Sequence, residues 1–108
     1  MDSAGFTDPE VAEMVEHLTR QQEEIAQVQR SVEAMLVKGS SRGREVVATV
    51  RGTGELAEVS IDPAALRRFD AHDLGTVVTE AVNDARRRLA KASEARFAPL
   101  LAVADRLA

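Results

Sequence analysis

The chain contains no cysteine, tryptophan or tyrosine, and its only aromatic residues are three phenylalanines. The lack of cysteine excludes disulfide bonds, thiolate catalysis and cysteine-based metal sites. No hydrophobic run approaches the roughly 20 apolar residues that span a bilayer. The N-terminal segment MDSAGFTDPE lacks the basic and apolar regions of a signal peptide. We therefore expect a cytoplasmic protein with no membrane contact, and any hydrophobic core must be aliphatic.

Catalytic chemistry finds little support in the sequence. The two histidines, His17 and His72, lie among acidic residues in stretches with helical patterns, where such neighbours are common on a surface. No glycine-rich loop leads into a helix with a phosphate-binding lysine. We therefore predict no enzyme activity, with no catalytic residue, no cofactor and no metal site.

Residues 45–66, EVVATVRGTGELAEVSIDPAAL, have the pattern of a β-hairpin. Residues two apart share one face of a strand, and the apolar residues predicted to share a face in this way are Val46, Ala48, Val50, Ala57, Val59 and Ile61. Gly52-Thr53-Gly54 provides residues that tolerate a positive φ in a tight turn. Asp62-Pro63 ends the second strand because proline has no N–H to donate.

A helical pattern precedes the hairpin, from Pro9 to about Ala34. Its apolar positions recur in alternating steps of three and four residues, as in a coiled coil. With Gln21 in the gap, they are Val11, Met14, Leu18, Ile25, Val28, Val32 and Met35. Such a helix would be roughly 39 Å long, which exceeds the length of the predicted strands. An amphipathic helix on its own sheet is one interpretation, but the regular repeat favours a coiled-coil-like contact with another helix.

The remaining segments complete the predicted fold. A short edge strand begins at 36–38, and 39–43 form a loop. After the hairpin, Asp70 and Asp73 stand at cap spacing before a second long helix. Pro99 breaks or kinks that helix, which leaves 98–108 as a C-terminal extension.

We therefore predict a single α+β domain over 1–108, with a flexible N-terminus at 1–7. It consists of a long N-terminal helix, a small three-stranded antiparallel sheet and a long C-terminal helix. Because so short a chain with such long helices builds only a small core, a homo-oligomer is favoured over a compact monomer.

The net charge of −4 conceals an uneven distribution. Residues 1–34 hold eight acidic and two basic residues, whereas the rest of the chain holds ten acidic and twelve basic residues. On the second helix, Asp84 is placed to pair with basic residues three and four positions later. The basic residues clustered there are Arg86, Arg87, Arg88, Lys91 and Arg96. They form either a solvated helix face with ordinary ion pairs or a surface for phosphates.

Two stretches resemble the YbaB/EbfC family of bacterial nucleoid-associated proteins. The hairpin is similar to the family's sheet, in which the second strand closes on Val-x-Ile-Asp-Pro, here ending at Ile61-Asp62-Pro63. The segment EAVNDARRRLAKASEARF is similar to the family's C-terminal helix, where an Ala-x-Asn-Asp-Ala run precedes paired basic residues. The resemblance covers about residues 9–97. It implies a homodimer whose sheets form a central core and whose helices project as tweezer-like arms.

The resemblance also implies a nucleoid-associated protein of the cytoplasm that binds duplex DNA with little sequence preference. Carried over by position, Arg87 and Arg88 match the family's basic pair. Because no aromatic residues are interleaved for stacking on bases, we expect contacts to the DNA backbone. The residues expected to make them are Arg20, Arg30, Arg42, Arg44, Arg87, Arg88, Lys91 and Arg96.

The first helix supports an alternative function. Family members commonly mix lysine and glutamate there, whereas this helix is nearly all acidic, which marks a divergent member. The Arg- and Ala-rich composition is consistent with an actinobacterial type. By analogy with secretion-linked members, the same fold would bind or stabilise another protein without strong DNA binding. Its docking surface would be Glu13, Glu16, Glu23 and Glu24.

Overall fold

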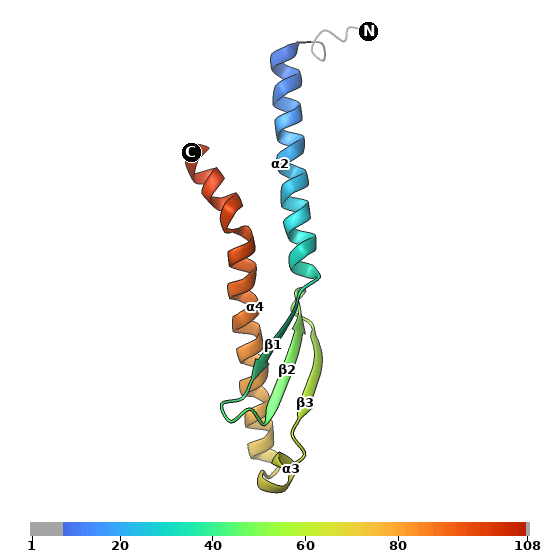
Figure 1. Cartoon of the computed structure of the whole chain (residues 1–108), viewed down its shortest axis with the longest axis vertical. Helices are drawn as coiled ribbons and strands as arrows, with labels where there is room; N and C mark the ends of the chain where they lie inside the picture. The colour runs from blue at the N-terminus through green and yellow to red at the C-terminus, as the bar shows by residue number, and fades with distance from the viewer. Residues whose placement is uncertain (1–7, 108) are drawn as a thin grey trace.

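The computed structural model describes residues 8–107 and contains two long helices and one sheet (Figure 1). The elements are α2 (Pro9–Glu33), β1 (Leu36–Ser40), β2 (Val46–Arg51), β3 (Leu56–Ile61), α3 (Ala65–Arg68) and α4 (Ala71–Leu107). The sheet is antiparallel with the order β1-β2-β3. The prediction of an α+β fold with these helices and three strands is confirmed. The N-terminus predicted to be flexible, 1–7, lies outside the described residues.

Helix α2 projects beyond the sheet instead of lying on it (Figure 1). It begins at Pro9, and the Asp8 carboxylate caps it by accepting a hydrogen bond from the Glu10 N–H at 3.0 Å. Only near its end does the heptad seam meet the rest of the chain, where Val32 is buried. Further out the seam is exposed, with Met14 at 65% and Leu18 at 52%. The chain's own sheet therefore does not cover this seam.

The hydrophobic core lies between β2 and α4. The side chains of β2 that were predicted to share a face are fully buried, and they pack against one stripe of the helix. The residues that form this core are Val46, Ala48, Val50, Ala81, Ala85 and Leu89. Because all of them are aliphatic, the core has the composition expected from the sequence.

Strand β3 departs from the predicted alternation at one position. Val59 and Ile61 pack against the core as predicted, but Ala57 is exposed. The pairing of β2 with β3 shifts between Thr49 and Val50, because Thr49 lies opposite Glu58 while Val50 lies opposite Leu56. Ala57 is therefore the extra residue of a β-bulge, and its side chain leaves the core face.

Strand β1 is longer than predicted, because it includes Gly39 and Ser40, which were assigned to a loop. A Cβ atom at Gly39 would lie 2.1 Å from the backbone nitrogen of Ala85. Glycine is therefore required for the strand to lie directly against α4. Gly39 and Ser40 pair with Ala48 and Val47 of β2, which extends the strand beyond Lys38.

Helix α4 begins after Asp70, whose Oδ1 accepts the Asp73 N–H at 2.8 Å and caps the first turn as predicted. Pro99 lies inside the helix and does not end it, since α4 continues to Leu107. Figure 1 shows the last part of α4 leaning away from its main axis. A proline removes one helical hydrogen bond and bends a helix in this way.

No helix within residues 8–107 has the length and apolar character required to cross a membrane.

Candidate nucleic-acid interface

Basic side chains from two parts of the chain meet where the β1–β2 loop, residues 41–45, approaches the middle of α4. An open concavity of about 670 Å³ lies there, with Arg42 and Arg44 from the loop and Arg87 and Arg88 from the helix in its lining. Two adjoining hollows add one lysine each and share Arg88 with it. We call the whole surface the basic concavity; its cations are Lys38, Arg42, Arg44, Arg87, Arg88 and Lys91.

Asp84 holds the two sides of the basic concavity together. Its carboxylate accepts the backbone N–H of Ser40 at 2.9 Å and Nε of Arg88 at 3.0 Å, and it lies 3.9 Å from a guanidinium nitrogen of Arg87. The Ser40 N–H, followed by the Arg88 side chain, lowers the pKa of Asp84 below its usual value. The ionised carboxylate therefore joins the edge of β1 to α4 and orients Arg88.

The loop that carries Arg42 and Arg44 is internally braced. The Ser41 side chain is buried, and its Oγ donates to Glu45 Oε1 at 2.9 Å and accepts the Val46 N–H at 3.1 Å. The Glu45 backbone N–H and the Ser41 hydroxyl lower the pKa of the Glu45 carboxyl. These contacts fix the conformation of the loop backbone.

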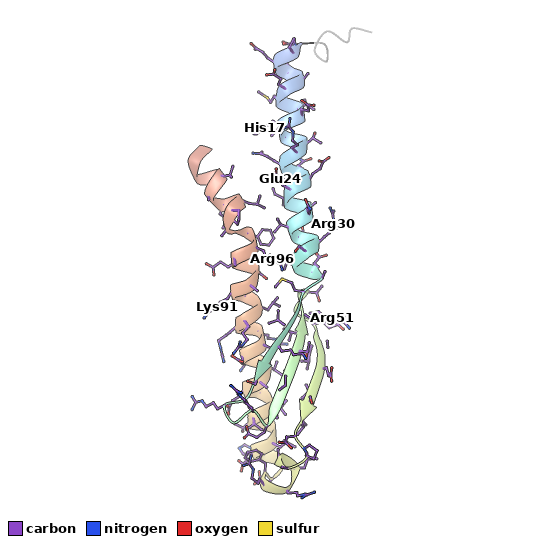
Figure 2. The ribbon with its side chains drawn as sticks, in the orientation of Figure 1. His17, Glu24, Arg30, Arg51, Lys91 and Arg96 are labelled. Atoms are coloured by element: carbon purple, nitrogen blue, oxygen red, sulfur yellow. The ribbon has the colours of Figure 1, made fainter. Side chains whose placement is uncertain are left out.

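The other predicted contact residues lie away from the basic concavity. Arg96 lies between α4 and α2 (Figure 2), where it hydrogen-bonds to Ser31 Oγ and connects the two helices. Arg20 lies 3.8 Å from Glu16 on α2, with both side chains largely exposed. Arg30 is on α2 as well (Figure 2). The structure therefore groups five of the eight predicted residues and separates these three.

Sequence reasoning missed Lys38, which is not among the residues expected to contact DNA. Lys38 and Ser40 are two residues apart on β1, so they share a face of the strand, and both line a hollow of the basic concavity. That period of two was the available signal. It became useful only once the strand was known to extend to Ser40.

The described residues contain no group of three or more histidine or acidic side chains placed to hold a metal ion. The acidic residues proposed as a docking surface are exposed on α2, and Figure 2 shows one of them, Glu24, on the projecting part of that helix. This acidic surface and the basic concavity are therefore separate.

The chain is similar in sequence to a known family and to two of its relatives. The model of the YbaB/EbfC DNA-binding family matches residues 8–104. A nucleoid-associated protein of Saccharopolyspora erythraea is 32% identical over 92 residues, which cover 85% of this chain and 79% of that protein. One from Nocardia farcinica is 31% identical over 91 residues, covering 84% and 83%.

A solved structure supports the same fold. The crystal structure of an uncharacterized protein from Helicobacter pylori superposes with a TM-score of 0.66 at 20% identity. The match covers 94% of this chain and 98% of that chain. Nearly the whole architecture is therefore shared.

Proposed function

The chain belongs to the YbaB/EbfC DNA-binding family, and from this premise we propose that it binds duplex DNA through its basic concavity. The predictions of the family and of a nucleoid-associated, DNA-binding function are confirmed by the family match and by the names of the relatives. The proposal that DNA binds at the basic concavity rests on one observation. Six basic side chains converge on this surface, although the net charge of the chain is −4.

The proposed contacts go to backbone phosphates. Lysine and arginine side chains that neutralise phosphates release condensed counterions, which drives binding without reading the bases. The basic concavity contains no aromatic side chain for stacking on bases. We therefore expect little sequence preference.

The acidic helix does not neutralise this surface. Helix α2 leads into the start of β1, whereas the β1–β2 loop follows the end of that strand. Five strand residues span about 17 Å, roughly twice the screening length of ~8 Å at physiological salt. A protein partner at the acidic face of α2 would therefore occupy a different surface, and binding of DNA and of a partner are separable.

We also propose that the functional unit is a homodimer that covers the exposed seam of α2. We expect light scattering to give about twice the chain mass of 11.7 kDa. Leu18→Glu/Ile25→Glu should yield a monomer, because each glutamate would be buried unpaired in the seam. Thr19→Glu/Gln27→Glu adds the same charge beside the seam and should remain dimeric. A wild-type mass of one chain would contradict the proposal.

The proposed function is tested by the fluorescence anisotropy of a labelled duplex. A length of about 30 base pairs exceeds the 76 Å long axis of the chain. We expect a dissociation constant on the order of 1–100 μM at physiological salt, as is typical of non-specific DNA binding, and a smaller one at low salt. Lack of binding at low salt would reject the proposal.

A further inference from the structure

Arg44 adopts a backbone conformation that arginine rarely takes. Its φ is 62°, and it is the one non-glycine residue within 8–107 with a positive φ. In this region the Cβ atom crowds the backbone, so glycine adopts the conformation far more easily. Gly43 precedes it and does not have a positive φ. The loop therefore places an arginine where a glycine would fit with less strain.

The surrounding contacts hold this conformation in place. The Arg44 N–H donates to the Ser41 carbonyl at 2.9 Å, and the Ser41 N–H donates to the Val46 carbonyl at 3.0 Å. Ser41 is only 2% exposed. Glu45, which accepts the Ser41 hydroxyl, also lies 3.7 Å from Arg68. A strained residue persists where its environment fixes it, and such residues concentrate at functional sites.

Arg44 lies where two parts of the basic concavity meet. Arg44 and Arg88 both line the main concavity and the hollow that contains Lys38. Arg88 is paired with Asp84, whereas Arg44 takes part in none of the ion pairs found among the described residues. Its charge is therefore available to a ligand.

We propose that Arg44 is a dedicated phosphate-contact residue, which the braced loop presents beside Arg88 to one backbone phosphate of the duplex. This inference rests on the proposed function, because it assigns one contact within it. A loop backbone that is ordered before binding loses less conformational entropy when the DNA arrives. The strain at Arg44 is then explained by the surface on which it places the start of this side chain.

The test compares three variants by thermal melting and by anisotropy with the labelled duplex over a range of salt. Arg44→Gly removes the cation and the strain together, so we expect a Tm equal to or above that of the wild type. We expect its dissociation constant to rise about tenfold. The slope of the logarithm of the binding constant against the logarithm of the salt concentration should become smaller by about one for each Arg44 that contacts the duplex. Arg44→Lys keeps the charge, so its salt slope should be unchanged and its affinity within about threefold.

The matched control is Arg67→Gln, which removes one exposed charge outside the basic concavity and should change the affinity less than about twofold. If the wild type binds DNA and the affinity of Arg44→Gly falls no more than that of Arg67→Gln, the role of Arg44 is rejected while DNA binding stands. A Tm of Arg44→Gly below that of the wild type also rejects it, because the arginine would then be structural. If the wild type does not bind, both the proposed function and this inference fail.

Discussion

Replacing both Arg87 and Lys91 by glutamate is expected to weaken duplex binding on the order of 100-fold at physiological salt. Both residues are exposed on α4 and line the same hollow. The substitutions remove two phosphate contacts and place two carboxylates where the phosphates would approach. Neither side chain lies in the core, and the Arg87–Asp84 ion pair that is lost is long, at 3.9 Å, so the melting temperature should fall only slightly.

The control for this prediction is Arg51→Glu/Arg67→Glu. Both double variants change the formal net charge from −4 to −8, but Arg51 and Arg67 lie outside the basic concavity. The control should lose less than about fivefold in affinity, since Arg51 and Arg67 line no part of the surface proposed to contact the phosphates and would act only through screened attraction. An equal loss in both variants would mean that overall charge, and not this surface, determines DNA binding.

Gly39→Ala is expected to destabilise the chain by about 3 kcal/mol, roughly a hundredfold in the folding equilibrium constant. The new methyl group would lie 2.1 Å from the nitrogen and 2.5 Å from the Cα of Ala85. These are backbone atoms, so no side-chain rotation relieves the overlap, and α4 must move away from β1. The same displacement would separate Ser40 from Asp84 and weaken DNA binding.

Gly75→Ala, in helix α4, is the control. Its added methyl group meets no atom within 4 Å, and alanine is favoured over glycine inside a helix by about 0.5–1 kcal/mol. Urea unfolding should therefore show opposite signs for the two substitutions. If Gly39→Ala unfolds at the urea concentration of the wild type, the close packing of β1 on α4 is wrong.

The elements that local signals specify could be predicted from the sequence. Helix α2 starts at Pro9 and α4 starts after Asp70, because caps and apolar periodicity act within a few residues. The extension of β1 and the bulge at Ala57 could not be predicted in this way. Both depend on how a strand fits against a neighbour that is distant in sequence.

In the candidate site, too, only the features set by local spacing could be predicted from the sequence. The pairing of Asp84 with Arg88 follows from helical spacing and was predicted. The approach of Arg42 and Arg44 to that pair depends on the contact between Ser40 and Asp84, which are 44 residues apart. Arg96 appeared equivalent to Lys91 in the sequence, but the path of α2 draws it to Ser31. The resemblance to the YbaB/EbfC family, and not the spacing of the charged residues, indicated DNA as the ligand.

The most direct test of the account is the salt dependence of wild-type binding to two labelled duplexes of unrelated sequence. If Arg42, Arg44, Arg87 and Lys91 of one protomer each neutralise one phosphate, affinity should fall about 100-fold between roughly 50 mM and 200 mM salt, and more steeply if both protomers of a dimer contact the duplex. The fall should be the same for both duplexes. Affinity that does not change with salt, or no binding at about 50 mM, would contradict phosphate contact through the basic concavity.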